Sequence, residues 1–289
     1  MHPTGKHLKK SILYLTLLLF CFSLNTFAQI DSLVVKEKYT AHNKGKFTLS
    51  WGGNRDKFSH SDIHFFGKDY NFVINDAVAH DKPMGWHTNY INPSKMTIPQ
   101  TNFKLGYFIT DKYSVSIGVD HMKYVMTQNQ IANITGVIDG NSPFNGSYAN
   151  TPTVMTEEFL KFEHTDGLNY VYTEVARQDD ISHWLGIKNT DKIQVNINEG
   201  FGLGFLYPKT NTTLMGKERH DDFHVSGYGT SIKAGLNFTF FKYFTIEGGL
   251  KGGYINMPDI RTTKSTSDHA SQHFFFFEKI ISFGGIFRI

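Results

Sequence analysis

The amino-acid sequence predicts an all-β protein whose strands close into an antiparallel, up-and-down transmembrane β-barrel of eight strands. Three observations support this fold class. Apolar and polar residues alternate over runs of about ten residues, the length that a tilted strand needs to cross a bilayer. Tight turns alternate with long polar loops, as they do in barrels of this class. The predicted inner faces carry charges among glycines and serines, which suits a narrow polar interior better than a soluble core.

The N-terminus has the features of a secretory signal peptide over residues 1–28. Three lysines precede an apolar stretch of about a dozen residues, which ends at the small-residue exit Thr26-Phe27-Ala28. The stretch is shorter than the ~20 residues of a spanning helix. We therefore expect export through the Sec route, cleavage after Ala28, a periplasmic lead over residues 29–44 and a barrel over 45–289.

Cleavage changes the charge and the thiol content. The chain has 29 Lys and Arg against 26 Asp and Glu, and the signal holds three lysines and no acid, so the mature chain has no net charge. A general basic character is therefore absent, which argues against nucleic acid as a partner. The single cysteine, Cys21, leaves with the signal and lacks the small residues that precede a lipid-modified cysteine.

The first strands are short or ambiguous. Alternation begins at Lys46 and continues to Gly52, with one apolar face. The runs 62–65 and 70–78 also alternate, either as one strand with a bulge at Gly67 or as two strands.

The middle of the chain predicts a hairpin and then a long loop. Strands over 102–109 and 113–120 flank the tight turn Thr110-Asp111-Lys112. Residues 128–166 lose the alternation and are rich in turn residues, which predicts an exposed loop. Residues 168–177 predict a strand whose faces the pattern does not assign.

The C-terminal half repeats the alternation most clearly, with Glu199 as an exception on an apolar face. It predicts strands over 193–207, 228–240 and 244–254, tight turns at 189–192 and 241–242, loops over 208–226 and 258–272, and a last strand that ends at Ile289. Counting backward from Ile289 gives eight strands. The count is ten if residues 46–80 form a hairpin and 81–100 add one more strand.

The last strand carries the most specific motif. Ser282, Gly284, Phe287 and Ile289 follow a spacing that resembles the C-terminal signal by which the outer-membrane assembly machinery recognises barrels, with isoleucine in place of the usual terminal aromatic residue. From Lys46 onward the chain resembles the porin-like outer-membrane β-barrel proteins of Bacteroidota. The resemblance implies a bacterial outer-membrane location and contact with outer-membrane lipids, lipopolysaccharide and the assembly machinery. It implies no chemistry and no cofactor.

The polar faces of these strands give the candidate residues of the interior. We expect opposite charges among them to pair across the barrel and to fill it. These residues are Lys104, Asp120, Lys233, Glu247, Lys251, Glu278 and Arg288.

Catalytic constellations are weak. His60-Ser61 provides the residue types of a lipid A deacylase without its motif. Asp120-His121 is half of a catalytic triad, but period 2 sends the two side chains to opposite faces. We therefore expect no enzyme.

Three other patterns have simpler structural explanations. Asp62 and His64 share one face and fit a hydrogen-bonded plug in the interior. Residues 220–224 offer metal-ligand side chains on a loop that provides little preorganisation. The sequons at Asn133 and Asn211 match a eukaryotic signal by chance. We expect no metal and no cofactor.

Three functions follow from this reading. The leading one is a structural or surface-interaction barrel with a filled interior, whose long loops contact a surface glycan or a protein. A narrow passive channel for small solutes is the second, and a lipid A-modifying enzyme is the third.

Overall fold

The computed structural model describes residues 39, 41–83, 100–140 and 142–289, and all structural statements concern these residues. The expected signal peptide and most of the expected periplasmic lead lie outside them, as does most of the 81–100 segment. In the described part of the chain, no helix is long and apolar enough to cross a membrane. The helix that is described there is the short 3-10 helix η2 (Ser182–Leu185).

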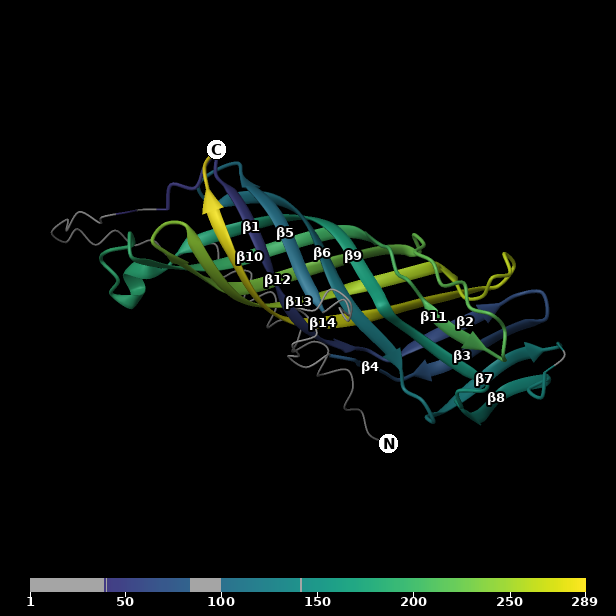
Figure 1. The fold of residues 1–289 in the computed structure, drawn as a ribbon. Coiled ribbons are helices and arrows are strands. Elements are labelled where there is room, and N and C mark those ends of the chain that lie inside the picture. The colour runs from purple at the N-terminus through teal and green to yellow at the C-terminus, as the bar shows by residue number, and fades with distance from the viewer. Residues whose placement is uncertain (1–38, 40, 84–99, 141) are drawn as a thin grey trace, which may run out of the picture. The chain divides into compact units, whose positions relative to one another are not determined.

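Eight antiparallel strands form a closed ring (Figure 1). In ring order they are β1 (Phe47–Phe58), β5 (Thr101–Phe108), β6 (Tyr113–Met126), β9 (Leu160–Asp180), β10 (Ile193–Leu206), β12 (Gly227–Phe240), β13 (Phe244–Arg261) and β14 (His269–Phe287). The first strand pairs with the last from Phe47 opposite Phe287 to Phe58 opposite Phe276, which closes the sheet. The prediction of an eight-stranded, up-and-down barrel is confirmed.

One end of the ring carries the tight turns, and we call it the turn end. Residues 109–112 join β5 to β6, and residues 241–243 join β12 to β13. Phe241 and Lys242 both adopt positive φ, at 52° and 71°, as the two central residues of a tight hairpin turn do. These turns lie where the sequence predicts them.

At the opposite end the sheet continues beyond the ring, and we call this part the extension. The N-terminal end of β14, residues 269–272, pairs with β2 (Ser61–Phe66). The strand order then continues through β3 (Tyr70–Ala77), β7 (Ile131–Ile138) and β8 (Gly146–Val154). On the other side β4 (Ala79–Asp81) pairs with β6, and β11 (Asn211–Leu214) pairs with β9. The runs 62–65 and 70–78 are therefore a hairpin outside the ring, and the ring does not reach ten strands.

The extension corrects the three loop predictions. The expected loop 128–166 contains β7, β8 and the start of β9, and the expected loop 208–226 contains β11. The loop 258–272 shrinks to residues 262–268 between β13 and β14. Register shifts at Met122/Tyr124, Ile134/Thr135 and Met257/Ile260 break the alternation on which the sequence analysis depends.

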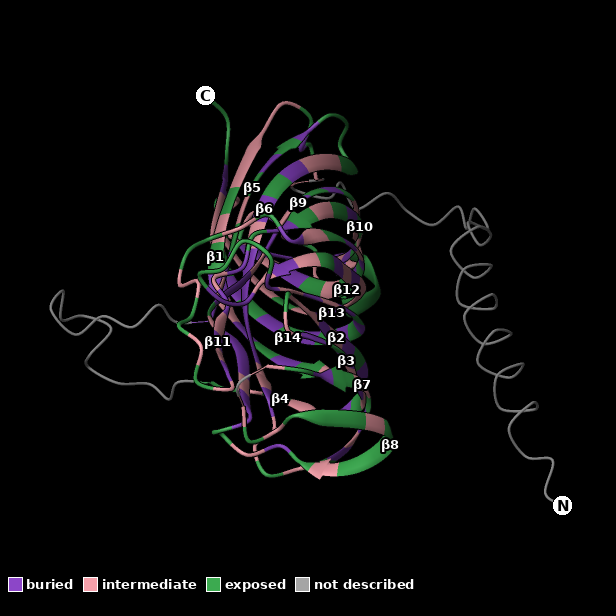
Figure 2. Ribbon diagram, turned by 90° about the vertical axis from the view of Figure 1, so that its right-hand side faces the viewer, coloured by how far each residue is buried: buried purple, intermediate pink, exposed green. Residues whose placement is uncertain are grey.

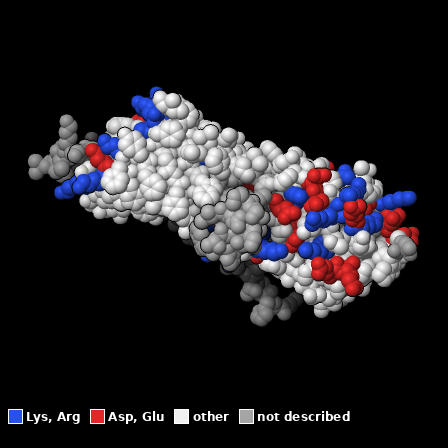
Figure 3. Space-filling view, viewed as in Figure 1, with Lys and Arg blue, Asp and Glu red and all other residues white. Residues whose placement is uncertain are grey.

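The outer surface of the ring is an apolar belt. Exposed and buried residues alternate along the ring strands (Figure 2), and the face seen in Figure 3 has a band without charged side chains between two charged ends. The exposed apolar side chains include Leu49, Trp51, Phe103, Leu105, Tyr107, Ile117, Val175, Phe201, Leu203, Phe205, Ile232, Leu236, Leu250, Ile281 and Phe283. Exposure of such a large apolar surface to water is unfavourable, whereas contact with lipid tails is favourable. Glu199 opposes Arg177 on the same face, so the exception in the pattern has a cationic neighbour.

The interior has two zones. Toward the turn end it is polar and charged. Toward the extension it is an apolar core, whose members include Ile63, Phe65, Phe72, Ile74, Met122, Tyr124, Phe159, Phe162, Leu206, Met257 and Phe274. Side chains from both the ring and the extension build this core, so the two parts share it.

Candidate functional site

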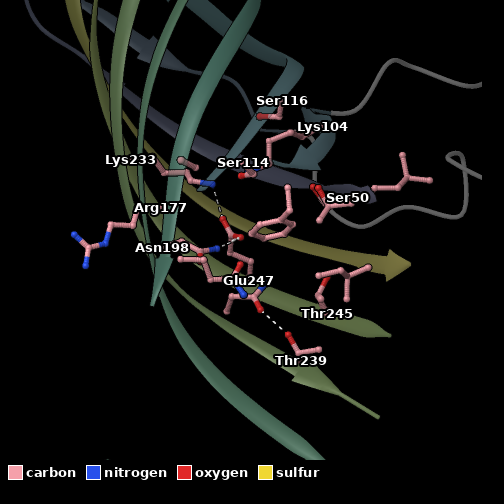
Figure 4. A pocket seen from close by; sticks show the side chains of 17 residues that line it. Ser50, Lys104, Ser114, Ser116, Arg177, Asn198, Lys233, Thr239, Thr245 and Glu247 are labelled. Carbon is pink, nitrogen blue, oxygen red and sulfur yellow. Dashed lines mark hydrogen bonds and ion pairs between the residues drawn. The ribbon is translucent and has the colours of Figure 1, made fainter. Parts of the chain in front are cut away.

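The polar zone contains two layers of paired charges, and the lower layer lies nearer the turn end. Lys104 Nζ lies 3.1 Å from a carboxylate oxygen of Glu174, and Lys233 Nζ lies 3.5 Å from the same oxygen. Lys233 also contacts Glu247 at 2.7 Å, and Asn198 donates to Glu247 at 2.8 Å (Figure 4). The five side chains come from five ring strands, so this network braces the barrel across its interior.

The upper layer centres on Lys251, which is 1% exposed. Its ammonium group bonds Asp120 and lies 3.9 Å from Glu278. Asn102 donates to Asp120 at 2.6 Å and to Glu278 at 2.8 Å, and the Tyr172 hydroxyl donates to Asp120 at 3.3 Å. The same ammonium lies 4.1 Å from the centre of the Tyr172 ring, a cation–π contact.

Inner-face glycines provide the room for these long side chains. Gly118 opposes Tyr172, and a Cβ atom at residue 118 would lie 2.6 Å from its ring. A Cβ atom at Gly200 would lie 2.9 Å from Glu174 Cδ. The glycines on the polar faces are therefore part of the packing of the charged layers.

A small cavity of about 50 Å³ adjoins the lower layer. Its lining includes Ser50, Lys104, Ser116, Lys233, Thr245 and Glu247 (Figure 4). This volume accommodates a few water molecules and is too small for a sugar or an amino acid.

The apolar core begins directly above the upper layer. The Tyr170 ring stacks on that of Tyr172, with centroids 5.0 Å apart. Farther along, Phe162 packs against Phe65 with centroids 5.4 Å apart and against Tyr124 at 6.4 Å. Among the described residues, the polar zone is therefore covered by a packed apolar core on the side of the extension.

One histidine lies inside this core. His164 is fully buried between the rings of Tyr124 and Phe162, and its Nδ1 lies 3.0 Å from the Thr210 hydroxyl. Burial lowers the pKa of His164 to about 3, because the charged imidazolium is disfavoured there. The residue is thus a neutral member of the core at physiological pH.

We expect His164 to make the extension sensitive to acid. The pKa is lowered in the folded state, so the unfolded chain binds more protons between about pH 6.5 and 3, and stability falls as the pH falls through that window. The total loss is about 4–5 kcal/mol. The measurement is the rate of limited proteolysis of the extension at pH 7.5 and pH 4.5. His164→Leu should cost about 1 kcal/mol at neutral pH and flatten this dependence. An equal pH dependence in both proteins would contradict the assignment.

The structure places six of the seven expected interior residues in the two layers. These are Lys104, Asp120, Lys233, Glu247, Lys251 and Glu278. Arg288 is the exception, because it follows the end of β14, is exposed and donates to the Lys44 carbonyl at 2.7 Å. The sequence pattern does not identify Glu174 and Tyr172, because it does not assign the two faces of residues 168–177. In the sheet, Glu174 lies opposite Ser116 and Tyr172 lies opposite Gly118 of β6, and this pairing identifies them as inner-face residues.

The two catalytic alternatives do not form a triad in the described structure. His60 Nδ1 contacts Asp76 at 3.1 Å, whereas the Ser61 hydroxyl is buried and lies 3.4 Å from the Tyr124 hydroxyl. Asp120 bonds Lys251 inside the barrel, and His121 Nδ1 contacts the Asn169 side chain at 2.8 Å. In each pair the two side chains have different partners.

Asp62 and His64 do not form an interior plug, contrary to the prediction. They lie on the solvent face of β2, where Asp62 accepts a hydrogen bond from the Asp76 backbone at 2.8 Å and His64 contacts Asn71 at 2.6 Å. In segment 220–224, Asp221 contacts Lys209 and Arg219, whereas His224 lies 2.8 Å from Asp259. No group of three or more His, Cys, Asp or Glu in the described chain could hold a metal ion.

The comparisons with known proteins give fold-level likenesses. No protein-family model matches the sequence, and no curated protein matches it either. Similar solved structures include the outer membrane protein OprG from Pseudomonas aeruginosa, with 11% identity, a TM-score of 0.38, and coverage of 86% of this chain and 99% of that one. Ail of Yersinia pestis has 9% identity, a TM-score of 0.24, and coverage of 82% and 99%. Neisserial surface protein A has 8% identity, a TM-score of 0.27, and coverage of 82% and 97%. The barrel assignment depends on the closed ring of strand pairs and not on these likenesses.

Proposed function

We propose that the chain is an outer-membrane β-barrel with a filled interior, whose ordered extension makes contacts at the cell surface with a glycan or a protein. The signal-like N-terminus and the apolar belt support the location. Every backbone polar group must be paired within lipid, and a closed ring meets this requirement. The short turns then face the periplasm and the extension faces outward.

The observation that carries this proposal is the apolar core over the polar zone. Ile63, Phe65, Phe72, Phe162 and Phe274 are all 0–1% exposed. A solute channel requires a polar path through the barrel, and an interior packed in this way opposes one. The cavity of about 50 Å³ beside the lower layer is a small pocket rather than a path.

The extension provides the surface for contacts. Its last strand, β8, is exposed along most of its length and pairs on one side with β7. In the described part of the chain its other edge pairs with no strand, and a free edge is a docking element for extended partners. The Ser, Thr, Asn and Tyr side chains of β8 suit hydrogen-bonding partners such as glycans.

Single-channel recording tests the filled interior. We expect the mature chain, refolded and inserted into a planar bilayer, to give no conductance steps, because the apolar core excludes ions. The folded state is checked by the heat-dependent shift in gel mobility of the same sample. Steady steps from folded protein would contradict the proposal and make the chain a pore, with Lys104, Lys233, Glu247 and Lys251 as selectivity candidates.

A separate binding experiment tests the extension as the contact surface. The refolded chain is applied to a glycan array beside a variant in which the β7–β8 hairpin, residues 131–154, is replaced by a short linker. Binding that the variant loses supports the extension as the contact surface, whereas equal binding by both opposes it.

We further propose that the barrel has no enzymatic activity and enters the membrane through the assembly machinery. The first statement is supported by the contacts of His60 and Ser61, because the His60 ring contacts Asp76 and the Ser61 hydroxyl lies beside that of Tyr124. A changed lipid A mass spectrum on deletion or overexpression would oppose it. The C-terminal motif supports the second statement, since Ser282, Gly284 and Phe287 lie on the strand that closes the ring.

A further inference from the structure

The charges in the middle of the interior do not balance. The two layers together with Asp56 hold three lysines and five carboxylates, so these eight groups carry an excess of two negative charges. The lysines are Lys104, Lys233 and Lys251, and the carboxylates are Asp56, Asp120, Glu174, Glu247 and Glu278. Asp81, which shares the Gln100 donor with Asp56, is a further carboxylate beside them. Asp120, Glu174 and Glu247 each contact a lysine within 3.1 Å. Of the five carboxylates, those without a lysine this close are Asp56 and Glu278, which oppose each other on β1 and β14, and Glu278 Oε2 lies 3.9 Å from Lys251 Nζ.

Oxygen atoms without a donor belong to these two carboxylates and to amide side chains on β1 and at the start of β5. Five of them accept no hydrogen bond from a described residue, although their side chains are at least nine-tenths buried. They are Asn54 Oδ1, Asp56 Oδ1, Gln100 Oε1, Asn102 Oδ1 and Glu278 Oε2. A buried polar atom without a partner is costly, and a set composed only of acceptors calls for a positive ligand.

Hydrogen bonds fix the orientation of two of the three amides. Gln100 Nε2 donates to Asp56 at 3.0 Å and to Asp81 at 2.6 Å. Asn102 Nδ2 donates to Asp120 at 2.6 Å and to Glu278 at 2.8 Å. Since each nitrogen already serves two carboxylates, a flip of the amide would place oxygen against oxygen, and the amide oxygens keep their positions.

We propose that this cluster binds one hard divalent cation, with Ca²⁺ as the best match. Calcium takes six to eight oxygen ligands from carboxylates and amide or backbone carbonyls, and water fills the remaining positions. Two carboxylates also provide the two negative charges that one divalent ion neutralises. The site differs from a cluster of three or more acidic or histidine ligands, because most of its ligand atoms are amide oxygens.

The cation joins the strands at which the barrel closes. Asn54 and Asp56 lie on β1, Asn102 lies on β5, Gln100 immediately precedes β5, and Glu278 lies on β14. β1 pairs with both neighbours, opposite Asn102 through Gly52 and opposite Glu278 through Asp56. A bound ion would therefore hold together the first and the last strand of the ring and stabilise the folded state.

The test uses the mature chain refolded in detergent without lipopolysaccharide, which itself binds calcium. After treatment with EDTA, Ca²⁺ content is measured by equilibrium dialysis and mass spectrometry, and the thermal midpoint is followed by the gel-mobility shift. We expect about one Ca²⁺ per chain and a saturable rise of the midpoint. Glu278→Gln should weaken binding roughly tenfold or more. Asp56→Asn is the second variant, should Glu278→Gln fail to fold.

Glu247→Gln is the matched control, because Glu247 is an interior carboxylate of the lower layer that is paired with Lys233. It should keep the calcium response. Three outcomes would overturn the proposal: no saturable Ca²⁺ binding to the parent protein, equal binding by Glu278→Gln and the parent, or equal loss in Glu247→Gln and Glu278→Gln. A parent protein that gains stability on acidification and ignores Ca²⁺ would assign a shared proton to the two carboxylates instead.

Discussion

Replacing Asp120 with alanine is expected to destabilise the barrel by about 3–5 kcal/mol, because it leaves a buried ammonium without its main counter-charge. Lys251 is 1% exposed and Asp120 is not exposed at all. Asp120 also accepts hydrogen bonds from Asn102 and Tyr172, which the variant loses. The measurement is the urea midpoint of the refolded chain in lipid vesicles, followed by tryptophan fluorescence.

A charge pair at the turn end is the control. Lys112 and Asp179 lie 2.9 Å apart but are 53% and 32% exposed, so Asp179→Ala should cost less than about 1 kcal/mol. The double variant Asp120→Leu/Lys251→Met should recover most of the lost stability, since it removes both charges. A cost for Asp120→Ala no larger than that for Asp179→Ala would show that the upper layer does not stabilise the barrel.

Phe162→Ala is expected to cost about 3–5 kcal/mol, and the loss should concentrate in the extension. Phe162 is completely buried, and its ring packs against Phe65, Tyr124 and His164. Removal of the ring leaves a cavity at the point where β9 meets β2. The measurement is limited proteolysis, in which the β2–β3 and β7–β8 hairpins should become sensitive while the ring keeps its gel-mobility shift.

Phe275→Ala is the control for this variant, because Phe275 is the same residue type on β14 and is 65% exposed. It should change proteolysis little. If the hairpins of Phe162→Ala resist proteolysis as well as those of the parent protein, the apolar core does not stabilise the extension. If the ring unfolds with the extension, the two parts form one cooperative unit.

The ring could be predicted from the sequence because its two faces contact different surroundings. On β10 and β12, apolar residues such as Phe201 and Ile232 face outward, and residues such as Asn198 and Lys233 face inward, so a period of two persists over the whole strand. The extension could be predicted only in part. Its strands β2 and β3 bury one face and alternate, so the sequence shows them as strands but not that they lie outside the ring. On β7 and β8 the pattern fails, because a register shift at Ile134/Thr135 interrupts the period and β8 is exposed along most of its length.

The interior site was predictable in part. Alternation alone placed Lys104, Lys233 and Glu247 on inner faces, where the structure has them. It did not reveal their partners, because pairs such as Lys251 with Asp120 are 131 residues apart and depend on the order of strands in the ring. It also passed over uncharged residues such as Asn102, whose importance comes from the carboxylates around it.

The dual pairing of β14 has a consequence for the order of folding. Residues 276–287 of β14 pair with β1, and residues 269–272 pair with β2. Both partner strands precede β14 by about 200 residues or more. Contacts so distant in sequence form late, since a long loop must close first. Until β14 arrives, β1 and β2 both present unpaired edges, which are templates for aggregation. Pairing of β14 is thus the step that removes the free edges of β1 and β2 together.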